Sequence, residues 1–174
     1  MKINDYKNQA NKQIRGILKS FYFAVRGFAF CVINERNMRI HICVAAFALI
    51  LSRFYSFTKT EYILLFIAVM FVVITEMINT AFETLVNMQV SRFDNFAKIA
   101  KDVAAGAVLM SAAFALIIGI LLFLDISKIK EMFSYIFARG WLVGLFIAFF
   151  AASVAFIFFP GSLVRRKKTK FEEK

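Results

Sequence analysis

Long apolar runs separated by short polar segments fill the chain from residue 40 onward. Each run has about the 17–25 residues that a helix needs to cross a bilayer. The pattern predicts four spans, at residues 40–57, 62–78, 103–124 and 141–159. Because the sequence has one proline and no alternation of apolar and polar positions, the spans are expected to be helices and not the strands of a barrel.

Basic residues recur at helical spacing before the first of these spans. Lys12, Arg15, Lys19, Tyr22 and Arg26 follow one another at intervals of three or four residues, and apolar side chains fill the positions between them. This arrangement is typical of a basic amphipathic helix that lies in the membrane interface.

The composition agrees with a protein of the membrane. Hydrophobic residues make up 61% of the chain and aromatic residues 17%, a larger apolar share than soluble domains have. The predicted fold class is therefore an all-α integral membrane protein. A cleaved signal peptide is not expected, because Arg26 interrupts the first apolar stretch and no small-residue cleavage site follows.

Lysine and arginine give the predicted orientation. The cytoplasmic side is assigned 17 of them, in the N-terminal segment, the 87–102 loop and the C-terminal segment, and the other side five. Since cytoplasmic loops are rich in these residues, both termini are predicted in the cytoplasm of a bacterial cell, with the chain crossing its inner (plasma) membrane several times. The predicted segments are a cytoplasmic amphipathic helix (1–39), three spans (40–124), an external loop (125–140), a fourth transmembrane helix (141–160) and a basic cytoplasmic tail (161–174).

The net charge of +11 limits the classes of partner. Its basic residues are spread over three cytoplasmic segments without a recognisable reading module, so nucleic acid is not expected. Anionic membrane lipids and nucleotide phosphates are the predicted partners. Cys31 and Cys43 lie apart, without metal-ligand spacing and on the reducing side, and no disulfide is expected.

The motif TEMINTAFE, residues 75–83, ends the second predicted span with polar groups. Glu76, Asn79 and Glu83 stand at i, i+3 and i+7 and so share one helix face. Counting the helical rise places Glu83 at the cytoplasmic boundary and Glu76 about two turns deeper. An ionisable residue inside a span costs about 2.5–3.5 kcal/mol on insertion scales, which makes it a functional candidate. A structural alternative is a carboxylate that pairs with a basic residue of a neighbouring helix.

Two other stretches bring complementary groups to the same boundary. FAKIAKDVAAGAVLM carries Lys98, Lys101 and Asp102, and INERNMRIH carries Glu35 among amide and basic residues. Mg²⁺ takes one or two carboxylates together with phosphate oxygens, which Glu35 and Glu83 suit, and lysines would offset phosphate charge. The sequence has neither a P-loop nor the protein-kinase motifs.

The stretches NERNMRIH, TEMINTAFETLVN and AKIAKDVAAGAVLM resemble the three signature motifs of the prokaryotic diacylglycerol kinase family of membrane enzymes. They occur in the family's order and spacing, and the resemblance covers about residues 12–124. It implies an ATP-dependent lipid kinase with Mg²⁺ as cofactor, assembled as a homotrimer whose three-span cores share their active sites. The implied residues are a general base at Glu76 with the nearby amide of Asn79, metal ligands at Glu35 and Glu83, and nucleotide contacts at Lys101 and Asp102.

The ERN…H form of the first motif is similar to the Gram-positive branch of the family, which phosphorylates undecaprenol. Undecaprenol is therefore the expected lipid alcohol, with diacylglycerol as the alternative. Asn87 departs from the family, which usually has Asp there. The fourth span lies outside the resemblance and, with Gly140 and Gly144 in a GxxxG pair, is expected to pack around the trimer. A non-catalytic membrane protein with a structural carboxylate network is the alternative of another class.

Overall fold

The computed structural model describes residues 3–89 and 94–158. Within these residues all regular structure is helical, which confirms the all-α class. The helices are α1 (Ile3–Asn34), α2 (Arg36–Ser52), α3 (Lys59–Gln89), α4 (Asn95–Phe123), α5 (Ile126–Phe137) and α6 (Gly140–Ile157).

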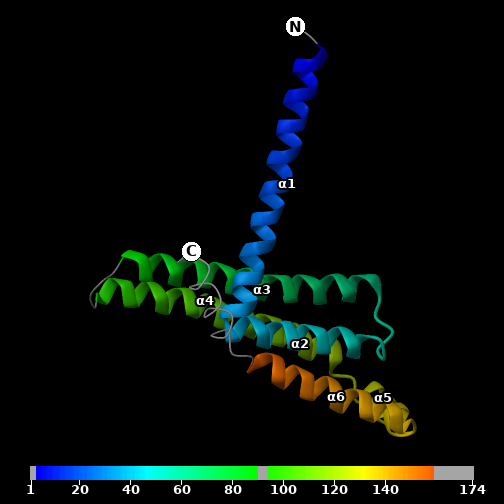
Figure 1. Cartoon of the computed structure of the whole chain (residues 1–174). Coiled ribbons are helices and arrows are strands. Elements are labelled where there is room, and N and C mark those ends of the chain that lie inside the picture. Colours follow the sequence, from blue (N-terminus) through cyan, green and yellow to red (C-terminus); the bar gives the residue numbers. More distant parts are fainter. Residues whose placement is uncertain (1–2, 90–93, 159–174) are drawn as a thin grey trace.

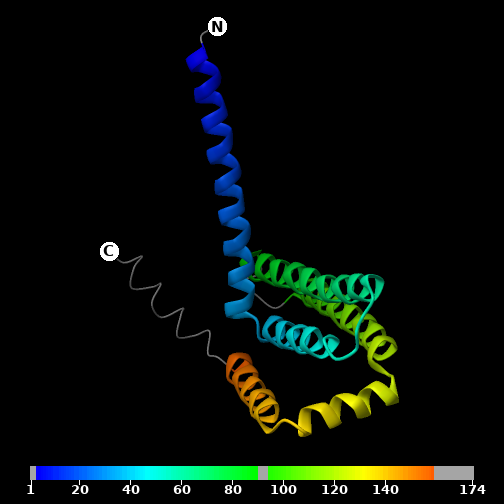
Figure 2. The same ribbon diagram turned by 90° about the vertical axis from the view of Figure 1, so that its right-hand side faces the viewer.

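The helices form a bundle from which α1 projects. α3 and α4 run side by side, and α2 lies between this pair and α6 (Figures 1 and 2). α5 connects the end of α4 to the start of α6 at one end of the bundle (Figure 2). α1 meets α2 and α3 only near its C-terminal end and otherwise extends away, across the direction of α3 and α4 (Figure 1). The change of direction occurs at Glu35, whose backbone is extended between α1 and α2.

Local sequence signals set where three of the helices begin. At the start of α3, the backbone N–H and the hydroxyl of Thr58 both donate to the Glu61 carboxylate at 2.7 Å, as in a capping box. The Asp94 and Asp125 carboxylates accept hydrogen bonds from N–H groups in the first turns of α4 and α5. Each cap satisfies backbone donors that have no partner inside the helix.

Hydroxyl and small side chains hold α3 against α4. The Thr75 and Ser111 hydroxyls share a hydrogen bond of 2.7 Å between the two helices, and Ser111 is buried. Ser111 follows the Ala- and Gly-rich stretch of α4, in which small residues allow two helix backbones to approach closely. This interface keeps the polar end of α3 inside the bundle.

Four helical segments of the described chain are long and apolar enough to cross a membrane by length and composition: Lys12–Asn34, Lys59–Met88, Asn95–Phe123 and Gly140–Ile157. The last three correspond to the predicted second, third and fourth spans. The first belongs to the segment assigned to the interface by its charge pattern. It runs across the direction of α3 and α4 (Figure 1), and its placement in the membrane interface stays a prediction.

The first predicted span, residues 40–57, is shorter than expected. α2 ends at Ser52 after 17 residues, about 25 Å by helical rise. The chain then turns, because Tyr55 and Phe57 are buried against Phe123 at the end of α4. The Tyr55 hydroxyl donates to the Phe123 carbonyl at 3.0 Å, and this tertiary contact replaces the end of the predicted helix.

The loop predicted at residues 125–140 is instead helical over most of its length. Asp125 caps α5, and apolar side chains recur along it at helical spacing, with Ile136 buried. The end of the predicted fourth span, at Phe159 and Pro160, and the basic tail 161–174 lie outside the described residues.

The Arg39 guanidinium joins the ends of two helices to α2. Arg39 is 6% exposed, and its Nη1 donates to the carbonyls of Val32 and Ile33 at 3.1 and 2.9 Å. Its Nε donates to the Ile157 carbonyl at 3.1 Å. These carbonyls belong to the last turns of α1 and α6, where backbone acceptors lack helical partners and the helix dipole favours a cation. Arg39 thus holds both helices against α2.

Replacing Arg39 with methionine keeps a long apolar side chain but removes the donors. We expect the free energy of unfolding to fall by about 1–3 kcal/mol, because carbonyls are left without partners. Reversible unfolding in detergent measures the change. Arg36→Met is the matched control: Arg36 is exposed and lies 4.9 Å from the Phe158 ring centre, so its loss should cost less than about 1 kcal/mol. Equal losses in the two variants would contradict this account of Arg39.

Candidate active site

The buried face of α3 changes from apolar to polar along its length. With the exception of one adjacent pair, its buried side chains follow one another at intervals of three or four residues, so they form a single stripe. They are Leu65, Ala68, Val72, Glu76, Asn79 and Thr80. The change falls between Val72 and Glu76, so the predicted catalytic residues begin where the apolar part of the stripe ends.

Glu76 is buried without a hydrogen-bond partner. The residue is 1% exposed, and neither carboxyl oxygen has a partner among the described residues. The Glu76 side chain lies within electrostatic range of Glu35 and Glu83, which are also acidic. An unpaired buried carboxyl lowers stability, so its presence calls for a functional reason. The structural alternative is that Glu76 pairs with a basic residue of a neighbouring helix. In the part of the chain that the structure describes, Glu76 has no such partner.

Asn79 links the buried end of the site to its boundary. Its Nδ2 donates to Oε1 of Glu83 at 3.2 Å, which confirms that these two residues share a face. The Asn79 Oδ1 is buried and has no partner in the described chain. Glu83 is half-buried, four residues closer to the end of α3. Asn79 therefore orients the Glu83 carboxylate and leaves one acceptor of its own available.

Glu35 reaches the same cluster from the break between α1 and α2. It is half-buried at the N-cap position of α2, yet its side chain makes no capping hydrogen bond. Burial raises the pKa of the Glu35 carboxyl above its ordinary value, the Glu83 carboxylate raises it further, and Arg39 offsets part of the rise. Two acidic groups that repel one another at this position favour a bound cation.

The predicted nucleotide contacts lie on the first turns of α4. The Lys101 ammonium donates to the Asn87 Oδ1 at 2.6 Å, which ties α4 to the end of α3. Asn87 therefore supplies a neutral acceptor for Lys101. Lys98 and Asp102 are exposed. The structure brings Glu35, Glu76, Asn79 and Glu83 together, and it gives Asp102 and Lys98 no hydrogen bond to that cluster within the described chain.

The donor set fits a magnesium ion that also binds phosphate. Among the described residues, no three His, Cys, Asp or Glu side chains come together as a metal cage. Mg²⁺ does not need one, since it usually keeps water and takes one or two carboxylates plus substrate phosphates. Glu35 and Glu83, the two half-buried carboxylates of the cluster, would provide these ligands, whereas the third acid, Glu76, is buried.

Two residues around the site were not assigned by sequence reasoning. The buried hydroxyl of Thr80 donates to the Glu76 carbonyl at 3.0 Å, next to the candidate base. Arg39 positions the break that carries Glu35, as its bonds to Val32 and Ile33 show. The motif INERNMRIH contains Arg39, but nothing in the sequence indicates that its partners are helix-end carbonyls.

The fold and the cluster together define an integral membrane protein with a polar site inside its helix bundle. The sequence profile described as prokaryotic diacylglycerol kinase matches residues 22–123. The chain belongs to the prokaryotic diacylglycerol kinase family and is a lipid kinase, whose phosphoryl donor is a nucleotide such as ATP. The non-catalytic alternative is therefore set aside.

Two curated relatives share much of the chain. It is 34% identical to the undecaprenol kinase of Bacillus subtilis (strain 168) over 124 residues, which cover 71% of this chain and 98% of the relative. It is 35% identical to the diacylglycerol kinase of Synechocystis sp. (strain ATCC 27184 / PCC 6803 / Kazusa) over 104 residues, which cover 59% of each. No solved structure matches the chain significantly.

Replacing Glu76 with glutamine is expected to stabilise the protein. The amide keeps the shape of the side chain but carries no charge, so the free energy of unfolding should rise by up to about 3 kcal/mol. Glu83→Gln is the control and should show no such gain, because Glu83 is half-buried and accepts a hydrogen bond from Asn79. A loss of stability in Glu76→Gln would reveal a stabilising partner of the Glu76 carboxylate. Unfolding in detergent with calorimetric or spectroscopic detection measures both variants.

Proposed function

We propose that this lipid kinase transfers the γ-phosphoryl group of ATP to the hydroxyl of undecaprenol. The observation that carries the reaction is the buried Glu76 carboxyl, whose oxygens have no partner in the described chain. Identity does not separate the two candidate lipids, since the relatives are 34% and 35% identical. Coverage favours undecaprenol, because the match spans 98% of the undecaprenol kinase and 59% of the diacylglycerol kinase. Diacylglycerol is the alternative substrate.

Glu76 acts as the general base in this proposal. A carboxylate at the inner end of the polar stripe accepts the proton of the lipid hydroxyl. The lipid oxygen then forms a bond to the γ-phosphorus, while the bond from that phosphorus to the β–γ bridging oxygen breaks and ADP leaves. Asn79 holds Glu83 in place through its Nδ2 and offers its free Oδ1 to a polar group of the substrate.

Glu35 and Glu83 are the proposed ligands of Mg²⁺, and Lys101 and Asp102 the proposed nucleotide contacts. When bound, the ion would neutralise charge on the phosphate oxygens. The Lys101 ammonium, held by Asn87, presents a positive charge beside the end of α3. Phosphoryl transfer depends mainly on such positioning and electrostatic stabilisation, so a site of few residues suffices.

The charge pattern and the family membership support a proposal for the arrangement in the cell. We propose a homotrimer in a bacterial plasma membrane, with shared active sites at the cytoplasmic boundary and both termini in the cytoplasm. The exposed basic residues of α1, among them Lys12, Arg15, Lys19 and Arg26, support an interfacial helix that binds anionic lipids. Large exposed apolar side chains on all six helices agree with a lipid environment and with subunit contacts.

Purified protein incubated with γ-labelled ATP, Mg²⁺ and either undecaprenol or diacylglycerol tests the proposal directly. We expect labelled undecaprenyl phosphate and much less labelled phosphatidic acid. A preference for diacylglycerol would reassign the substrate within the same family. Labelled product from neither lipid would remove both candidates, and omission of Mg²⁺ should abolish transfer to either one.

The two glutamates of α3 are separated by their response to Mg²⁺. Glu83→Gln should weaken the metal site, because a neutral amide binds Mg²⁺ less well than a carboxylate, so higher Mg²⁺ recovers part of the rate. Glu76→Gln should keep ATP affinity while turnover falls by about 10²–10⁴-fold, and added Mg²⁺ should not restore it. Nucleotide affinity, Mg²⁺ dependence and turnover are measured in detergent. Mg²⁺ rescue of Glu76→Gln would show that the two roles are exchanged.

A further inference from the structure

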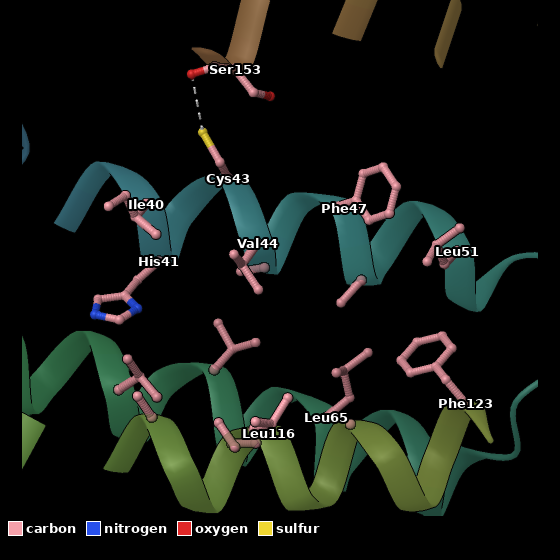
Figure 3. Close-up of a pocket in the computed structure, with 18 of the residues that line it drawn as sticks. Ile40, His41, Cys43, Val44, Phe47, Leu51, Leu65, Leu116, Phe123 and Ser153 are labelled. Carbon is pink, nitrogen blue, oxygen red and sulfur yellow. Dashed lines mark hydrogen bonds between the residues drawn. The ribbon is translucent and has the colours of Figure 1, made fainter. Parts of the chain in front are cut away.

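An apolar cavity of about 690 Å³ lies between α2, α3, α4 and α6. Figure 3 shows side chains of α2 and of the α3–α4 pair directed toward the space between them. α6 contributes aromatic and small side chains, including Phe149, Phe150 and Ser153. The volume is within the range of pockets that hold a small ligand, roughly 300–1,000 Å³. The lining is almost entirely apolar, so a hydrocarbon is the chemistry it fits.

The cavity ends where the candidate site begins. Leu65, Ala68 and Val72 line it, and they are the apolar part of the buried stripe of α3 that continues at Glu76. Val72 and Glu76 are four residues apart, about 6 Å along the helix. If the polar end of a molecule lies at Glu76, its long apolar tail can therefore extend along the same face of α3 into the cavity.

The two ends of the cavity differ in polarity. His41 lies at the end opposite Leu51, Leu65 and Phe123 (Figure 3). His41 is at the start of α2, six residues after Glu35, so the polar end of the cavity is also the end nearer the carboxylate cluster. The aromatic contacts of Phe123 with Tyr55 and Phe57 close the other end.

We propose that this cavity binds the first part of the polyprenyl tail of the lipid substrate, with α6 as one wall. The inference rests on the proposed function, because it places the hydroxyl of that substrate at Glu76. It gives the fourth predicted span a part in substrate selection beyond packing around the trimer. The residues proposed for the chemistry belong to α1–α4. The tail site is completed by α6, which lies outside the residues that the family profile matches, 22–123.

A specific tail is favoured over bulk membrane lipid by the unpartnered carboxyl at the polar end. The hydrophobic effect does not drive a tail from the bilayer into this cavity, since both surroundings are apolar. Selection must come from shape and from the polar end. Glu76 and the Asn79 Oδ1 are buried acceptors with no partner in the described chain, and a lipid hydroxyl is a donor that matches them.

Gly119 provides a direct test of the cavity in the full-length protein. It lines the cavity, and a Cβ added there would meet open space, so leucine fits the helix while filling the tail site. In Gly119→Leu we expect the KM for undecaprenol to rise by about tenfold or more, the scale on which overfilling a packed site is unfavourable. Phosphorylation of a prenol of one isoprene unit, whose tail ends before the cavity, should be unchanged.

Gly16→Leu is the matched control. Gly16 is an exposed glycine of α1 that does not line the cavity, and a Cβ there also meets open space. Its kinetics with both alcohols should equal those of the unmodified protein. If Gly119→Leu leaves the KM for undecaprenol unchanged, or lowers activity equally with both alcohols, the tail site is refuted while the kinase assignment stands. If the unmodified protein phosphorylates neither alcohol, the proposed function fails instead.

Photolabelling tests occupancy without turnover. Undecaprenol with a diazirine in the early part of its tail should label peptides of α4 and α6 in the absence of ATP. Unlabelled undecaprenol should compete, phosphatidylglycerol should not, and Gly119→Leu should lose the labelling. Equal competition by phosphatidylglycerol, or unchanged labelling in Gly119→Leu, would mean that bulk lipid fills the space and would overturn the proposal.

Discussion

The hydrogen bonds of the Arg39 guanidinium hold α1 and α6 in their positions against α2. Carbonyls at a helix end that are buried away from water each need a hydrogen-bond partner from the protein. Arg39 supplies donors to the last turns of both α1 and α6 from its position on α2. A guanidinium suits this task because it offers several donors in a fixed planar geometry. The same residue therefore sets the break at Glu35 and the position of α6.

The buried polar groups at the end of α3 lower the stability of the fold, and contacts elsewhere in the bundle offset that loss. Glu76 and Asn79 are buried with unpartnered oxygens, which is unfavourable for folding. The Thr75–Ser111 hydrogen bond holds α4 against α3, and the aromatic cluster around Tyr55 packs against Leu65 nearer the start of α3. Departures from the usual rules of burial are expected at functional sites, and here they coincide with the residues proposed for catalysis.

The family core carries the candidate residues for phosphoryl transfer, and α6 adds a wall of the apolar cavity. The profile match covers residues 22–123, which include every candidate residue of the phosphoryl-transfer site. α6 lies beyond that core, but it is joined to it by Arg39 and lines the apolar cavity beside α3. With α6 as a wall of the proposed tail site, the chemistry of the core can remain unchanged while the tail site differs between chains that have or lack this helix.

Hydropathy, charge and helical spacing by themselves determine much of this protein. They predict the all-helical membrane class and the second, third and fourth spans, because the length of an apolar run and the 3.6-residue period are local properties. They also place Asn79 and Glu83 on one face, and the motifs indicate the family. Even α5 has local signals of a helix, in its Asp125 cap and its apolar spacing, although the segment was predicted to be a loop.

Only the tertiary structure decided where α2 ends, what Arg39 binds and where the cavity lies. The Tyr55–Phe123 hydrogen bond joins residues 68 positions apart, and the Arg39–Ile157 bond joins residues 118 positions apart. No local pattern identifies such partners, since many carbonyls and aromatic rings are equally suitable by type. The same holds for Glu76: its spacing predicted a buried carboxylate, but whether that carboxylate has a partner depends on side chains that the neighbouring helices bring around it.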